Sequence, residues 1–408
     1  MKSMSQKQII SSVLVLVAVA LLYPIYNAPI WWVSLEAPNY PEEAFPDGVR
    51  ILFHVNGVFN GCVKQAKTEI TEDEALDCVH EMDTINHYVG MYPIASGGPV
   101  ELFFSLFLVT LVAVMLVAFA CVRPKIRMII MLVGFSGLAI WMGMAYYGAN
   151  GLKLHSERYL EGRITVLGET SEEMDAEEDT QQAESAGDAL IARLRAALDE
   201  EPAEEEAAPA PAAEPEIKHG LPVLEKGKEK NIAYLKDAYL QYRADQDNSL
   251  ADWTGSGSQV LAWHYQKSLG KYFRDPEVLK PMVAKIRTAG AVVFWGLIVI
   301  MIVLVVFARK PEGFWNWLLV LIPAGLPVFF AIEYAVWLWW YGHNMNDMGA
   351  FTLKAFMPTA FGQGKVAQFT TNSYPEYGFW LMVLFSALLL VSALLRRKPS
   401  ENDDPDEI

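Results

Sequence analysis

The sequence lacks the short motifs that identify the commonest catalytic sites. It contains no Gly-x-x-x-x-Gly-Lys phosphate loop, no Gly-x-Ser-x-Gly nucleophile elbow and no His-Glu-x-x-His zinc motif. Basic residues are also in deficit, because 32 Lys and Arg stand against 48 Asp and Glu, a net charge of −16. Nucleic-acid binding needs the opposite sign of charge. We therefore expect a non-enzymatic protein with no nucleic-acid partner.

Long uncharged stretches are abundant. The chain is 53% hydrophobic. Five runs of 18 to 21 residues hold no charged side chain: 9–26, 102–122, 128–147, 289–308 and 378–395. At 1.5 Å per residue, each run can cross a hydrocarbon core of about 30 Å. A sixth run, 314–341, carries Glu333 as its one charge and should be kinked by Pro323 and Pro327. The sequence predicts an all-α polytopic membrane protein with six transmembrane helices and outward-facing soluble segments.

The basic residues beside these runs predict the orientation. Six spans place four clusters of Lys and Arg on one side: 2–7, 123–127, 309–310 and 396–398. The positive-inside rule makes that side cytoplasmic, so we expect a multi-pass protein of the bacterial inner membrane with both termini inside. The first run continues to Trp31 and Trp32 without a small-residue cleavage site. This favours an uncleaved helix with tryptophans anchored at the lipid interface.

The chain then divides into alternating spans and outward segments. The expected parts are a first helix (1–27), an outward segment with a short hairpin and an interfacial helix (28–98), a transmembrane hairpin (99–148), an acidic linker (149–220), a small helical subdomain (221–285), a second transmembrane hairpin (286–341), an outward loop (342–376) and a last helix with a cytoplasmic tail (377–408). Residues 169–216 hold 17 acidic residues against Arg193 and Arg195. That composition predicts a mostly disordered linker.

Histidine is missing from all six runs, and cysteine is scarce. The seven histidines lie in the outward segments, which excludes haem held by paired histidines within the bilayer. Two of the three cysteines, Cys62 and Cys78, fall in the first outward segment. On an oxidising face we expect them to form a disulfide. A pair of thiolate metal ligands is the alternative, although the spacing is not that of a close Cys-x-x-Cys pair.

Two outward stretches gather possible metal ligands. If "CVHEMDTINHYVGM" is helical, His80, His87 and Met91 share one face. The stretch "YGHNMNDM" adds a second set: His343, Met345 and Met348. Imidazole and thioether together suit Cu(I). Two interpretations stay open, a copper site shared by the two loops or a docking helix in which His87 only holds the outward part to the bundle.

Two motifs also carry a resemblance. "INHYVGM", and "FMPTAFGQGKVAQFTTNSYPEYG" before the last span, resemble stretches of uncharacterised multi-pass bacterial membrane proteins. Those proteins accompany gene sets for periplasmic copper enzymes of the nitrous-oxide-reductase kind. The resemblance implies a role in maturing or supplying a metalloenzyme, and it assigns no catalytic residue.

Two further functions remain alternatives to an accessory protein that handles copper for, or docks to, such an enzyme. The first is a small-solute transporter that uses Glu333, since an ionisable group within a span defaults to a functional role. The second is a structural subunit of a larger membrane complex. In each case the expected partners are the lipid bilayer and a periplasmic or membrane protein.

Overall fold

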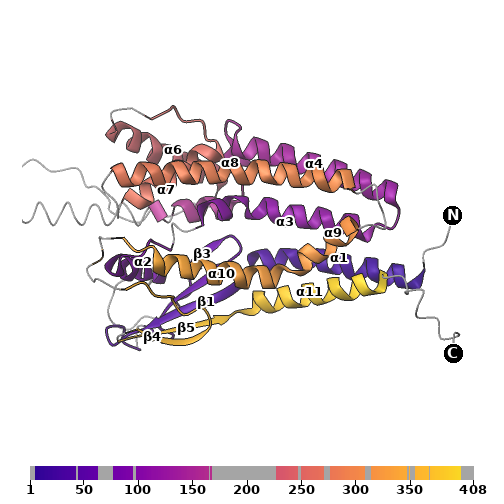
Figure 1. Cartoon of the computed structure of the whole chain (residues 1–408). Helices are drawn as coiled ribbons and strands as arrows, with labels where there is room; N and C mark the ends of the chain where they lie inside the picture. Colours follow the sequence, from indigo (N-terminus) through magenta and orange to yellow (C-terminus); the bar gives the residue numbers. More distant parts are fainter. Residues whose placement is uncertain are drawn as a thin grey trace, which may run out of the picture.

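The computed structural model of the chain is mostly helical (Figure 1). It describes residues 5–42, 45–62, 77–94, 98–164, 166–167, 227–246, 250–270, 276–307, 314–346, 349, 354–366 and 368–396. The helices are α1 (Gln6–Asn27), α2 (Cys78–Val89), α3 (Pro99–Ala120), α4 (Pro124–Tyr146), the short 3-10 helix η1 (Gly151–Leu154), α6 (Lys228–Asp245), α7 (Gly257–Gly270), α8 (Pro276–Phe307), α9 (Phe314–Ala324), α10 (Leu326–His343) and α11 (Tyr377–Arg396). The strands are β1 (Pro29–Glu36), β2 (Val49–His54), β3 (Gly57–Asn60), β4 (Gly362–Val366) and β5 (Phe369–Pro375). A further helical segment covers 157–164. The acidic stretch 169–216 lies outside the described residues.

Five helices are long and apolar enough to cross a membrane: α1, α3, α4, α8 and α11. α9 and α10 pass the same test only as a pair, and they are bent by 50° at the break between them. Pro323 lies inside α9 and Pro327 in the first turn of α10. Proline has no N–H to donate and its ring clashes with the preceding turn, so the expected kink is present. The pair is either one broken span or a re-entrant loop.

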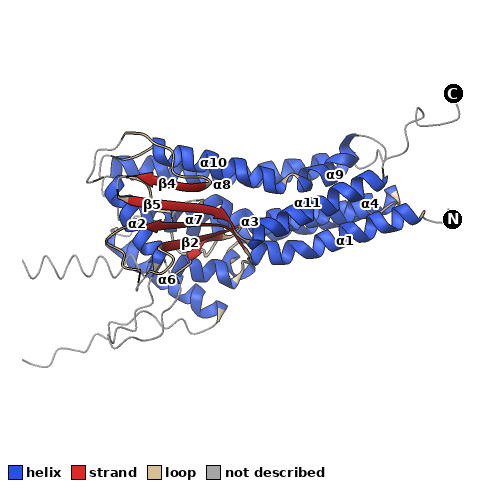
Figure 2. Ribbon diagram, turned by 90° about the horizontal axis from the view of Figure 1, so that it is seen from below, coloured by secondary structure: helices blue, strands red, loops and turns tan. Residues whose placement is uncertain are grey.

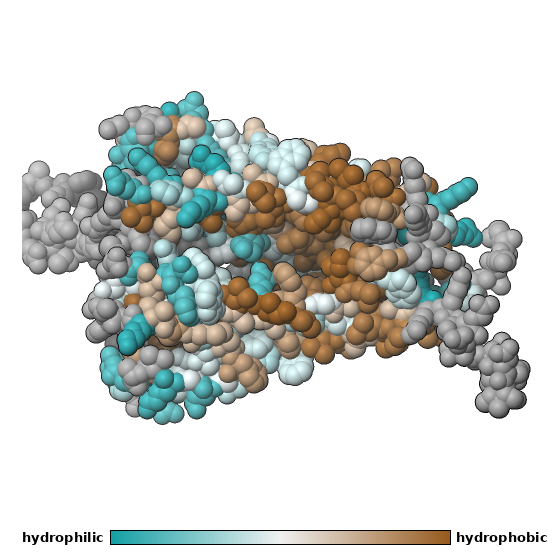
Figure 3. Space-filling view, in the orientation of Figure 1, coloured by the Kyte–Doolittle hydropathy of each residue, from teal (hydrophilic) through white to brown (hydrophobic). Residues whose placement is uncertain are grey.

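The surface of the helices is apolar in a broad belt. Figure 3 shows this belt across the middle of the molecule, with hydrophilic side chains gathered at the two ends. The belt is apolar because the helices expose aliphatic side chains. On α8, for example, Val292, Val299 and Val306 are each more than half exposed. Exposed valines at helical spacing have no favourable place in water, and the apolar helices indicate a lipid-bilayer environment.

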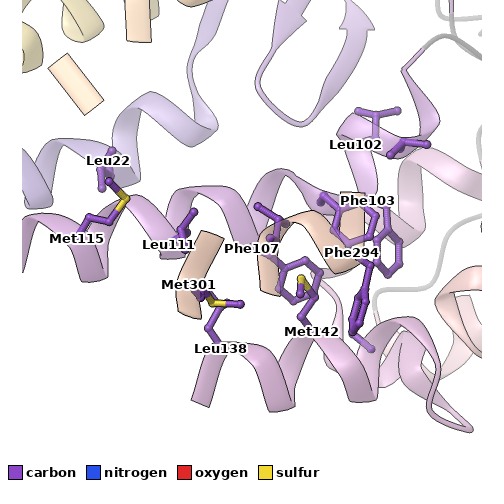
Figure 4. Packing of buried hydrophobic residues seen from close by; sticks show 14 of the residues in the cluster. Leu22, Leu102, Phe103, Phe107, Leu111, Met115, Leu138, Met142, Phe294 and Met301 are labelled. Carbon is purple, nitrogen blue, oxygen red and sulfur yellow. The ribbon is translucent and has the colours of Figure 1, made fainter. Parts of the chain in front are cut away.

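The core is built around α3. In its most apolar stretch 56% of residues are buried, against 28% in α1, α4 and α8. Figure 4 shows its side chains interleaved with those of the neighbouring helices, with Met115 beside Leu22 of α1, and Phe107 beside Met142 of α4. Phe103 and Phe107 are fully buried, and Phe103 lies edge-on to Tyr146 at 5.4 Å. α3 is therefore the central span of the bundle.

A five-stranded antiparallel sheet stands at one end of the bundle, which we call the sheet end (Figure 2). The strand order is β3-β2-β1-β5-β4. β1 follows α1 directly and β5 leads directly into α11, while α1 and α11 pack against each other. The two ends of the chain thus run side by side as helices and then as paired strands, with Trp32 opposite Tyr374.

The sheet corrects two expectations. The fold is helical with a small sheet rather than all-α, and segments 28–98 and 342–376 contribute strands to the same sheet. Trp31 is 6% exposed and is not an interfacial anchor. Its Nε1–H donates to Ser373 Oγ at 2.8 Å, and its ring packs against Tyr334 and Phe379. The indole is buried because the rings of α10 and the start of α11 pack against it, and its polar atom has a partner on β5.

We call the other end of the bundle the basic end. There Arg396, the last residue of α11, joins α11 to α1 and α3. Its guanidinium donates to Ser11 Oγ at 2.8 Å and to Ser12 Oγ at 2.9 Å, both on α1. It also donates to two carbonyl oxygens at the C-terminal end of α3, Ala120 O at 2.8 Å and Phe119 O. A helix C-terminus leaves carbonyls without intrahelical partners, and a cation is favourable there. One side chain therefore connects three spans.

Candidate functional site

α2 is held in place at both of its ends. At its start, Asp77 accepts a hydrogen bond from Val79 N at 2.9 Å, and Cys78 forms a disulfide with Cys62. The expected disulfide is therefore present, and these two sulfurs are not thiolate ligands. At its end, Gly90 adopts a left-handed conformation with φ of 82°, which terminates the helix.

The end of α2 corrects the expected ligand geometry. A helix over the whole of 78–91 would place His80, His87 and Met91 on one face. α2 instead ends at Val89, so Met91 lies beyond the last helical residue. The 3.6-residue repeat does not extend past Gly90, and Met91 packs with the sheet-end cluster around α2. His80, in the first turn of α2, and His87 are both half-buried.

The two loops that carry the His and Met side chains do meet. Asn346 N donates to Gly90 O at 2.7 Å. A methyl group on Gly349 would come within 2.8 Å of Gly90 N, so the two backbones leave no room for a side chain. Met91 is the residue after Gly90, and Met345 is the residue before Asn346, so both methionines lie next to this hydrogen bond. Met348 lies outside the described residues.

His343 has one ring nitrogen left for a ligand. It is exposed at the end of α10, stacked on Trp339 with ring centres 4.5 Å apart. Its Nδ1–H donates to Trp339 O at 2.7 Å, which leaves Nε2 as the possible ligand atom. Among the described residues, no group of three or more His, Cys, Asp or Glu side chains is arranged to hold a metal ion. A metal site here would therefore depend on methionine sulfur.

Glu333 lies in the middle of α10. Its side chain is exposed, and the charge of Glu101 in the first turn of α3 acts on it unfavourably. Asn344, three turns further along the chain, donates its side-chain N–H to Trp340 O at 2.8 Å.

A buried polar cluster at the sheet end was not singled out by the sequence. Ser156 N donates to His155 Nδ1 at 3.2 Å, and His155 Nε2–H donates to Phe103 O at 3.0 Å. His264 Nε2–H donates to Arg163 O at 2.9 Å, while the Arg163 guanidinium lies 3.4 Å from His264 Nδ1. Burial lowers the pKa of His155 to about 4 and holds the pKa of His264 well below its usual range. Both imidazoles are therefore neutral at pH 7.

No local signal identifies that cluster. His264 and Arg163 are 101 residues apart, and the acidic linker separates them. Their contacts join the segment 157–164 to α7, and so form the interior of the helical part at the sheet end. Each imidazole uses both nitrogens on this chain, which makes the cluster a packing element rather than a ligand site.

Comparison with protein-family models, with curated proteins and with solved structures finds no match for this chain.

Proposed function

We propose that the chain is an inner-membrane protein of bacteria with six spans, of which α9 and α10 together form the fifth. The sheet end then faces the periplasm and the basic end the cytoplasm. Arg123 and Lys125 lie at the turn between α3 and α4, and Arg396 ends α11, so this end of the bundle is basic, which supports the orientation. Protease added to intact spheroplasts should cut within 169–216. Protection of that stretch, with cutting only in inverted vesicles, would contradict the orientation.

The proposed function is that of a non-enzymatic accessory protein that handles copper for, or docks to, a periplasmic metalloenzyme. The observation that carries this proposal is the hydrogen bond from Asn346 to Gly90, which joins the two loops bearing His and Met side chains. The two motifs that resemble stretches of multi-pass bacterial membrane proteins, "INHYVGM" and "FMPTAFGQGKVAQFTTNSYPEYG", also lie at the sheet end. One covers the second half of α2, and the other contains β4 and β5.

The donor set favours Cu(I) over zinc. Met91 and Met345 supply thioethers next to the loop contact, and His343 supplies Nε2 because its other nitrogen is occupied. Thioether is a soft ligand that suits Cu(I), whereas zinc sites are built from thiolate, imidazole and carboxylate. His87, on the last turn of α2, is the second imidazole in this proposal.

The test is a competitive Cu(I) titration of the purified protein. Met91→Leu and Met345→Leu remove sulfur while keeping a similar apolar volume. Each should weaken Cu(I) binding by about tenfold or more, equivalent to about 1.4 kcal/mol. Met144→Leu is the matched control, since Met144 is 54% exposed on α4, a different span. If wild type and the three variants bind Cu(I) equally, copper handling is excluded, and docking to a metalloenzyme is the part of the proposal that stays.

A small-solute transporter is the second candidate. The observation that favours it is the 50° break between α9 and α10, because interrupted spans line the binding sites of many transporters. Glu333 lies on the second half of this broken span. Proteoliposomes loaded with pH- and Na⁺-sensitive dyes would test it. A flux that Glu333→Gln abolishes supports transport, and background flux in both proteins excludes it for these ions.

A further inference from the structure

One face of α10 is exposed along its length. Phe329, Ile332 and Val336 are 64%, 60% and 59% exposed, respectively. The opposite face is buried, with Tyr334 and Leu338 each 7% exposed against the sheet and α11. α10 is thus anchored on one side only, and its exposed side is the surface that a bilayer or another membrane helix covers.

Glu333 lies at the edge of that exposed face. Residues four apart stack along a helix, so Glu333 follows Phe329 one turn on, and Trp340 comes about two turns later. We call the line formed by Phe329, Glu333 and Trp340 the α10 edge. Trp340 is 44% exposed and pairs with Tyr92 at 5.7 Å, beside α2. Seven residues at 1.5 Å each place Glu333 about 10 Å below Trp340 along the helix.

Glu333 is the carboxylate of this edge, and it is exposed. The charge of a second exposed carboxylate, Glu101 in the first turn of α3, acts on it unfavourably. Within the described parts of the chain, no hydrogen bond or ion pair joins either carboxylate to a cationic side chain. Ionisable groups within spans are costly and pair with opposite charge. The edge therefore combines an apolar helix face with a carboxyl group that no cationic side chain in the described part of the chain pairs with.

We propose that the α10 edge binds a transmembrane helix of a partner protein that carries a lysine or arginine near its sheet-side end. A basic side chain on a helix can be placed at the depth of Glu333, whereas lipid headgroups lie about 10 Å above it, at the level of Trp340. A second copy of this chain is the alternative occupant, because α8 carries the exposed basic residues Lys285 and Arg287 toward its start, and the experiment below separates the two. This proposal stands apart from the copper proposal and uses none of its residues.

The experiment uses the full chain in liposomes of phosphatidylethanolamine and phosphatidylglycerol, with the photocrosslinker p-benzoylphenylalanine in place of Phe329. The probe is a leucine–alanine transmembrane peptide of about 20 apolar residues with one lysine two turns from its sheet-side end. An identical peptide with glutamine at that position is the comparison. The lysine peptide should crosslink about tenfold more than the glutamine peptide, the effect of one intramembrane polar contact.

The variants decide whether the carboxylates are responsible. Glu101→Gln combined with Glu333→Gln should bring the lysine peptide down to the glutamine level. Glu36→Gln is the matched control, since Glu36 is an exposed carboxylate of β1 that accepts from Asn372 outside the spans. Equal crosslinking of both peptides, no effect of the double substitution, or crosslinks only to lipid or to a second copy would each overturn the proposal. Cu(I) binding is measured separately, so the two proposals fail independently.

Discussion

His155 should make the stability of the sheet end depend on pH. The side chain is 2% exposed, and its pKa is lowered from 6.5 to about 4, chiefly because burial penalises the charged form. The unfolded chain therefore binds a proton in a range where the folded chain does not. Stability from the neutral imidazole is complete above pH 6.5 and is lost as the pH falls from 6.5 towards 4.

The magnitude follows from the two pKa values. A full shift of that size corresponds to about 3 kcal/mol, and about 2.5 kcal/mol of it is lost by about pH 4.5. Because the ring is almost fully buried, solvent screening takes little from this figure. Other groups titrate in the same range, so the informative quantity is the difference between wild type and His155→Gln. The amide of Gln can donate to Phe103 O and accept from Ser156 N without titrating.

The assay is reversible denaturant unfolding in detergent micelles, followed by tryptophan fluorescence from about pH 7.5 to about pH 4.5. Wild type should lose about 2.5 kcal/mol more than His155→Gln across this range. His343→Gln controls for loss of a histidine at an exposed position and should behave as wild type. If His155→Gln and wild type lose the same amount, then the neutral buried imidazole is the wrong description of this site.

Three further outcomes are expected. Reductant should destabilise wild type by about 3 kcal/mol and leave the Cys62→Ser, Cys78→Ser double variant unchanged in the same unfolding assay, because the disulfide closes a loop with a sequence separation of 16. Gly90→Ala should lower the free energy of unfolding by at least about 1 kcal/mol, since φ is 82° and the new methyl group would lie 2.6 Å from Asn346 O. Gly137→Ala, whose methyl group would have nothing within 4 Å, is the control and should not lower it measurably. Equal unfolding midpoints for the two variants would contradict this. Arg396→Met should lower the thermal unfolding midpoint by several degrees, because it leaves the carbonyls of Phe119 and Ala120 without this donor, whereas Arg123→Met at an exposed position should not; matching midpoints would show that Arg396 does not connect the spans.

The spans were readable from the sequence because they depend on local composition. About 20 consecutive apolar residues form a helix in lipid whatever surrounds them, since the backbone must satisfy its own hydrogen bonds there. The bend at 323–327 was predictable for the same reason, because proline acts on its own turn. The end of α2 at Gly90 also has a local signal, as glycine is the usual residue just past a helix C-terminus.

The sheet and the buried histidines were decided only by tertiary structure. The position of Trp31 after the first apolar run predicts an interfacial anchor. In the structure β5 pairs with β1, and Ser373, 342 residues away, accepts a hydrogen bond from the indole. His264 and Arg163 meet across a linker that carries no pattern pointing to either of them. Strand pairing and side-chain hydrogen bonds of this kind join residues far apart in the chain, and a periodicity read within one segment holds no information about its partner. The contact between Gly90 and Asn346 is of the same kind: the sequence supplied the His and Met side chains, and the fold brought their loops together.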